Sequence, residues 1–175
     1  MGVTGDFKGL DDLRARVAKI ATPSGRHAIT RNLADEASKL LSDEFKQSHD
    51  PYGNPWAPLT SRTGNPLLDT GTNLRDSLGP VSTPEGFTVS TAFIGAPVHQ
   101  YGATIRPKHA KALAFRTRGK PSKSNPRGKV SDLVFAGEVT IPRRQFMPEG
   151  DVGPIWKKGL EDAADDAMRD LLGMT

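Results

Sequence analysis

The feature that most constrains this chain is a proline-rich stretch at residues 50–78, which reads DPYGNPWAPLTSRTGNPLLDTGTNLRDSL. Its four prolines, at positions 51, 55, 58 and 66, forbid a continuous helix or a central strand, because proline lacks a backbone N–H and restricts φ. Trp56 and Leu59 are its apolar anchors, and Leu67 and Leu68 lead into a predicted short helix. The stretch separates a helical pattern from a strand pattern, so it is the predicted seam of an α+β domain.

Helices are predicted on both sides of the strand region. Apolar residues recur at three- and four-residue spacing over residues 7–21 and 26–47, and the TPSG run at 22–25 separates these two segments. A further amphipathic helix is predicted over residues 152–172. We therefore expect one domain, residues 1–175, in which an antiparallel sheet packs against the N-terminal helices and the C-terminal helix.

The sheet is predicted over residues 80–141, where apolar and polar residues alternate with a period of two. Pro84–Gly86 is a predicted hairpin turn, and Val98–Gly102 a predicted single helical turn. A long hairpin is expected from the pairing of Leu113–Phe115 with Leu133–Phe135. Residues 139–141 are expected to belong to the returning strand.

The tip of the long hairpin, residues 116–129, is a basic arm. The chain has nine Lys and Arg residues and no Asp or Glu from Arg106 to Lys129, whereas it has seven acids and three bases from Glu149 to Asp170. Three interpretations of the arm stay open: an arm that orders on an acidic protein partner, a solvated loop, or contact with the DNA phosphate backbone. The candidate partner-binding residues are Arg116, Arg118, Lys120, Lys123, Arg127, Lys129, Arg143 and Arg144.

No catalytic pattern stands out. The chain has no cysteine, and no two of its four histidines have the spacing of a metal pair on a helix. It has no nucleophile elbow, Walker loop or dinucleotide fingerprint. We therefore expect no enzyme activity, cofactor or metal site. No apolar run approaches the roughly 18–20 residues of a membrane span, and no signal-peptide pattern is present, so we expect synthesis in the cytoplasm without membrane association.

Four blocks, taken together in order, resemble a known family. They are GNPWAPL at 53–59, LLDTGTNLRDSL at 67–78, IGAPVHQYGATI at 94–105 and IPRRQFMP at 141–148, followed by the last helix. The ordered set is similar to that of the phage virion morphogenesis family, the tail completion proteins of tailed phages. The predicted structural anchors in and around these blocks are Trp56, Leu59, Leu68, Leu74, His99, Tyr101, Phe146 and Trp156.

The resemblance implies a structural virion protein of the neck or tail, made in the host cytoplasm. Such a protein caps the tail tube and enables head–tail joining as a ring of copies, hexameric in the family. Its implied partners are tail tube or sheath proteins, head-side connector proteins and, non-specifically, genomic DNA. Two alternatives stay open: a head-side connector or minor tail protein, and a small DNA-binding protein that uses the basic arm. A ring needs two unlike faces on each copy, and the basic arm and the acidic C-terminal helix are the candidates.

Overall fold

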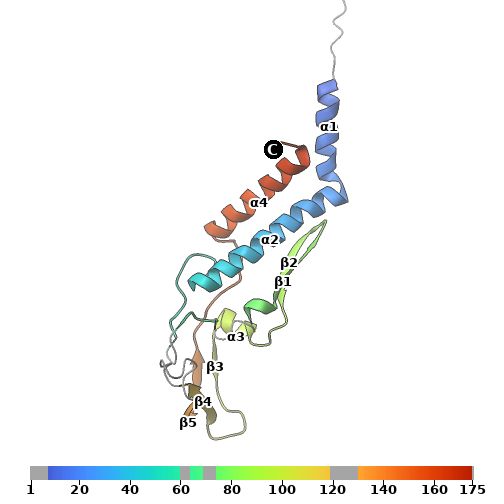
Figure 1. Cartoon of the computed structure of the whole chain (residues 1–175). Coiled ribbons are helices and arrows are strands. Elements are labelled where there is room, and N and C mark those ends of the chain that lie inside the picture. The colour runs from blue at the N-terminus through green and yellow to red at the C-terminus, as the bar shows by residue number, and fades with distance from the viewer. Residues whose placement is uncertain (1–7, 60–63, 69–73, 119–129, 175) are drawn as a thin grey trace, which may run out of the picture. The chain divides into compact units, whose positions relative to one another are not determined.

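The computed structural model describes residues 8–59, 64–68, 74–118 and 130–174 (Figure 1). It confirms an α+β fold with antiparallel strands. In chain order the elements are α1 (Lys8–Ala21), α2 (Pro23–Gln47), the 3-10 turn η1 (Arg75–Ser77), β1 (Leu78–Thr83), β2 (Gly86–Thr91), α3 (Ala96–Tyr101), β3 (Ala103–Ile105), β4 (Leu113–Arg118), β5 (Val130–Ala136), β6 (Val139–Ile141) and α4 (Pro154–Leu172).

The chain forms two compact units. The first unit contains Met1–Leu40, Gly79–Ser90 and Trp156–Thr175, and the second contains Leu41–Leu78 and Thr91–Ile155. Helix α2 begins in the first unit and ends in the second. That the two units unfold together as one domain remains a prediction.

In the first unit, α1 and α2 meet at a capped corner. The Thr22 hydroxyl accepts the Gly25 backbone N–H at 3.0 Å, and Pro23 occupies the first helical position. Threonine at the N-cap and proline directly after it are a favourable helix start. Helix α2 therefore begins at Pro23 and not at residue 26 as predicted. A Cβ on Gly25 would lie 2.0 Å from the Lys19 carbonyl oxygen, so the corner requires glycine.

The β1–β2 hairpin and α4 complete the first unit. The predicted turn at Pro84–Gly86 is confirmed, since β1 ends at Thr83 and β2 begins at Gly86. The Thr30 hydroxyl on α2 donates to the Thr83 carbonyl at 2.6 Å. Helix α4 runs beside α2 (Figure 1), where a Cβ on Gly159 would lie 3.2 Å from Leu40 Cδ1. The buried apolar residues of this unit are Ala34, Ala37, Trp156 and Ala167.

The strands do not form the single predicted sheet. The described residues form three two-stranded sheets, β1–β2, β3–β6 and β4–β5. The long hairpin is confirmed, with Phe115 opposite Val134 and Leu113 opposite Ala136. Residues 139–141, predicted as part of its returning strand, form the separate strand β6, which pairs with β3 through Ala103 and Ile141. A bend at Gly137 interrupts the strand pattern between β5 and β6.

The apolar core of the second unit gathers residues from five separate segments: Phe45, Trp56, Leu74, Ala96 and Phe146. The Phe45 ring meets the Trp56 ring edge-on at 5.5 Å and the Phe146 ring at 6.0 Å. In the described residues, the short helix predicted after Leu68 is a single 3-10 turn, Arg75–Ser77. Leu74 precedes this turn, Leu78 begins β1, and both pack on this core.

Candidate functional site

The four sequence blocks converge on one place in the second unit, which we call the motif cluster. Block one contributes Trp56, block two Leu74, block three Gln100, and block four Arg144 and Phe146. All five side chains are buried, with at most 7% of their surface exposed. The motif cluster therefore brings together buried side chains from four blocks that are far apart in the sequence.

A turn after α2 delivers Trp56 to the cluster. Ser48 has a positive φ of 58°, and the Asp50 carboxylate accepts the backbone N–H groups of Tyr52 at 2.9 Å and Asn54 at 2.8 Å. These are the hydrogen bonds of an Asx turn, which aspartate favours. The Trp56 N–H then donates to the Ser48 carbonyl at 2.8 Å. The chain therefore doubles back at the end of α2 and places the indole beside Phe45.

Block four holds block one by hydrogen bonds. The Trp56 indole Nε1 donates to the Gln145 carbonyl at 2.7 Å in a buried setting. In return, the Arg144 guanidinium donates through Nε to the Ala57 carbonyl at 2.9 Å and through Nη2 to the Pro58 carbonyl at 3.2 Å. Proline-rich loops leave carbonyls without helix or sheet partners, and a buried guanidinium supplies fixed donors for them.

Block three holds block four through Gln100. Its Oε1 accepts the backbone N–H groups of Phe146 and Met147, each at 3.1 Å, and its Nε2 donates to the Met147 carbonyl at 2.9 Å. One side chain thus replaces a strand partner for a segment that belongs to no sheet. Gly102 follows at φ 74°, where a Cβ would lie 3.0 Å from the Arg143 backbone nitrogen.

His99 lies at the edge of the cluster, half-buried. Its ring stacks on Phe93 with centroids 6.4 Å apart, and its carbonyl accepts the Arg144 N–H at 2.8 Å. Within the described residues its buried Nδ1 has no hydrogen-bond partner. Burial, and secondarily the Arg144 charge, lower the pKa of His99 below its usual 6.5. The ring is therefore neutral at physiological pH and acts as a packing group.

The other predicted anchors lie at several depths. Trp156 is buried in the first unit, Leu68 packs against the core, and Leu59 is half-buried. Tyr101 is 60% exposed, so it contributes little to the core of this chain. It is the last residue of α3.

The predicted partner-binding residues do not form one group. Arg143 is exposed and donates to Glu149 at 2.8 Å, whereas Arg144 is buried on backbone carbonyls and is unavailable to a partner. The backbones of Arg116 and Arg118 belong to β4. The remaining four, Lys120, Lys123, Arg127 and Lys129, lie outside the described residues.

Sequence reasoning predicts local turn chemistry at Asp50, which the Asx turn confirms, but it missed the role of Gln100. Asp50 carried a usable signal, because aspartate followed by Gly53 and Asn54 is typical of a side-chain-stabilised turn. Gln100 carried none, since its partners lie 46 and 47 residues away in the chain.

The chemistry of the cluster is structural. The polar side chains of Trp56, Gln100 and Arg144 all donate to or accept from backbone groups, so they fix the path of the chain. Within the described residues no three His, Asp or Glu side chains gather in a group that could hold a metal ion. The helices in that part of the chain are all too short or too polar to cross a membrane.

The comparisons with known proteins agree with this picture. A family model matches residues 6–174, nearly the whole chain and all four blocks. The comparison with curated proteins found no match, and neither did the comparison with solved structures. Because the family model covers the motif cluster and both compact units, this chain belongs to the phage virion morphogenesis family and has a structural or assembly role in a bacteriophage virion.

Proposed function

We propose that this protein is a tail completion protein, which caps the tail tube as a ring of identical copies and enables the tail to join the head. The observation that carries the proposal is the family match over residues 6–174. The same four blocks that suggested tail completion from sequence build the motif cluster, so the chain has the internal framework on which that resemblance rests.

The contrast between a buried motif cluster and exposed surfaces outside it supports an assembly role. The buried side chains of the motif cluster bond to or pack against the rest of the chain. Contacts with partners are therefore made by exposed surfaces outside the cluster. In the proposed ring, one side meets tail tube or sheath proteins and the other meets head-side connector proteins. Arg143, which is exposed and paired with Glu149, is a candidate for such a contact.

The direct test is electron microscopy of a lysate from phage that lacks this gene. We expect DNA-filled heads beside separate tails, some of irregular length, and joined particles when the gene is supplied from a plasmid. Normal joined particles without the gene would refute the proposal. Heads that fail to retain DNA, with tails of normal length, would instead indicate a head-side connector.

A DNA-binding role is the second candidate, favoured by the nine positive charges from Arg106 to Lys129. It predicts that the purified protein binds duplex DNA with an affinity that falls steeply as salt rises, because each neutralised phosphate releases counterions. Deleting Thr117–Arg127 would then abolish binding. Under the tail-completion proposal, the same deletion reduces incorporation into particles and leaves the protein folded.

A further inference from the structure

The β4–β5 hairpin is an apolar ribbon with two open faces. Opposed residues of an antiparallel pair point to the same face, so the register places Phe115 with Val134 on one face and Ala114 with Phe135 on the other. Both faces are exposed: 36% of Phe115 and 65% of Phe135 is accessible. On the second face Leu133, 51% exposed, extends the apolar surface.

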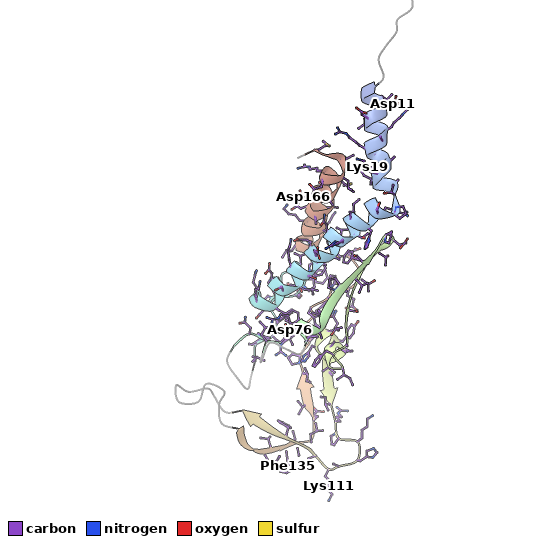
Figure 2. The ribbon with its side chains drawn as sticks, turned by 45° about the vertical axis from the view of Figure 1, so that its right-hand side comes forward. Asp11, Lys19, Asp76, Lys111, Phe135 and Asp166 are labelled. Carbon is purple, nitrogen blue, oxygen red and sulfur yellow. The ribbon has the colours of Figure 1, made fainter. Side chains whose placement is uncertain are left out.

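A ribbon of this kind has little stability on its own. In the described part of the chain, β4 and β5 pair only with each other, and a two-stranded ribbon is marginally stable in water without a surface to cover it. Apolar side chains on both faces, beside two unpaired strand edges, are typical of an interaction arm. Its charge is basic, because Lys108 and Lys111 are exposed in the loop before β4 and Arg116 belongs to the strand. Figure 2 shows Lys111 in that loop.

The first unit has a surface of opposite charge. Helices α2 and α4 line a groove of about 580 Å³ with the carboxylates of Asp35, Glu36, Asp162, Asp166 and Asp170. Two of these carboxylates are paired: Glu36 with Lys39, which also lines the groove, at 3.0 Å, and Asp162 with Lys158 at 2.6 Å. Among the described residues, the other three carboxylates, those of Asp35, Asp166 and Asp170, take part in no ion pair. Figure 2 shows Asp166 on α4.

The first unit also exposes an apolar stripe on α1. Leu10, Leu13 and Val17 lie at helical spacing and are 44%, 54% and 52% exposed. Arg16 Nη1 donates to the Leu172 carbonyl at 2.9 Å, which ties α1 to the end of the acidic helix α4. The first unit therefore has a surface that matches each property of the ribbon. Its carboxylates complement the basic charge of the ribbon, and its exposed apolar side chains complement the apolar faces.

We propose that the β4–β5 ribbon of one copy docks on the first unit of a second copy, with its basic positions against the α2–α4 carboxylates and its apolar faces against the neighbour's exposed apolar surface. This docking proposal rests on the proposed function, in which copies form a ring, and it specifies the contact between neighbouring copies. Donor and acceptor surfaces differ, so the contact is heterologous and repeats from copy to copy, as a ring requires. Opposite charges across the interface set the partner and its orientation.

Matched charge reversals test the proposal with the full chain. An arm-reversed variant carries Lys108→Glu, Lys111→Glu and Arg116→Glu, and a helix-reversed variant carries Asp35→Lys, Asp166→Lys and Asp170→Lys. Each variant alone opposes like charges, so we expect sedimentation velocity to show association about a hundredfold or more weaker than that of the wild type. The three carboxylates are exposed, so each variant should keep its circular dichroism and melting profile.

An equal mixture of the two variants is the decisive sample. Each arm then faces a helix of opposite charge at every contact, so the mixture, and a chain that carries all six changes, should sediment as the wild-type ring does. Unfolding cannot produce this recovery. A reversed variant that assembles like the wild type, a mixture that stays monomeric, or a wild-type chain that is monomeric at every concentration would overturn the proposal.

The apolar part has its own test. Leu133→Ser with Phe135→Ser should weaken self-association, whereas Ile94→Ser with Val152→Ser, which changes residues 95% and 42% exposed in the second unit outside the ribbon, should not. Equal effects of the two pairs would argue against a docking role of the ribbon.

The interface and the proposed function can fail separately. If the reversed variants assemble normally while phage without the gene still accumulates separate heads and tails, the interface is wrong and tail completion stands. If the charge-reversal pattern holds in solution while phage without the gene joins normally, the interface stands and tail completion is wrong. If the arm-reversed variant loses salt-sensitive binding to duplex DNA while its self-association is unchanged, the ribbon binds DNA and the docking proposal fails.

Discussion

At the scale of single residues, two glycines and one histidine show how closely the backbone is packed. Gly25 sits where α1 turns into α2, with the Lys19 carbonyl in the space that a side chain would need. Gly102 combines a φ of 74° with the nearby backbone of Arg143. His99 is kept neutral by burial beside Arg144. These constraints affect the stability of the fold, so substitutions at these positions should be assessed by the free energy of unfolding.

Gly25→Ala should destabilise the protein by at least about 2 kcal/mol, because a Cβ 2.0 Å from a backbone oxygen forces the helix corner to open. Gly9 in α1 is the matched control, since no atom lies within 4 Å of a Cβ there. Gly9→Ala should stabilise the protein by about 0.5–1 kcal/mol through helix propensity. Urea denaturation of both variants checks the contrast, and equal free energies of unfolding would contradict it.

His99 should make the protein less stable in mild acid. Its pKa is lowered in the folded state from 6.5, so below that pH the unfolded chain binds a proton that the folded chain does not. The free energy of unfolding therefore falls as pH drops from 6.5 toward the pKa of the folded state. Above 6.5, where His99 is neutral in both states, none of this stability is lost. His99→Phe keeps a ring against Phe93 and removes the titration. Thermal melts across this range should show a smaller acid-induced decrease in the variant, and parallel curves would refute the assignment.

At the scale of elements, short pieces of structure are held by side chains that bond to backbone. The segment Ile141–Pro148 begins at the end of β6 and is hydrogen-bonded by Gln100 of α3 and by Trp56 of the proline-rich loop. The loop in turn depends on the Arg144 guanidinium. Three elements with little regular hydrogen bonding of their own therefore stabilise one another.

Gln100→Leu should cost about 3 kcal/mol or more, because it leaves the N–H groups of Phe146 and Met147 and the Met147 carbonyl without this partner in a buried site. Gln47→Leu, at the exposed end of α2, should change stability by no more than about 0.5 kcal/mol. Chemical denaturation measures both. A loss for Gln100→Leu as small as that of the control would show that the segment is held by apolar packing alone.

At the scale of the whole molecule, the two compact units share one continuous helix. Residues Pro23–Leu40 of α2 belong to the first unit, and the rest of the helix belongs to the second and carries Phe45 into its core. Melting either unit would expose part of the same helix. The predicted single domain therefore implies cooperative unfolding.

Calorimetry tests that cooperativity. We expect one transition in which the van't Hoff and calorimetric enthalpies agree, because short helix segments have little stability without tertiary contacts. Gly25→Ala changes the first unit and Gln100→Leu the second, and each should lower the temperature of the same single transition. Two transitions, each shifted by only one of the substitutions, would show that the units unfold independently.

The sequence by itself determined the elements and the family. Apolar spacing of three and four located the helices, alternation located the Pro84–Gly86 hairpin and the β4–β5 pairing, and four ordered blocks identified the relatives. These signals are local or consist of residue identity in order, so a linear reading can detect them. The tertiary structure alone decided how the strands divide into three pairs, and that β6 joins β3. It also decided that Arg144 is buried while Arg143 is exposed. Adjacent arginines look alike in a sequence, and only contacts with residues more than 80 positions away separate them physically.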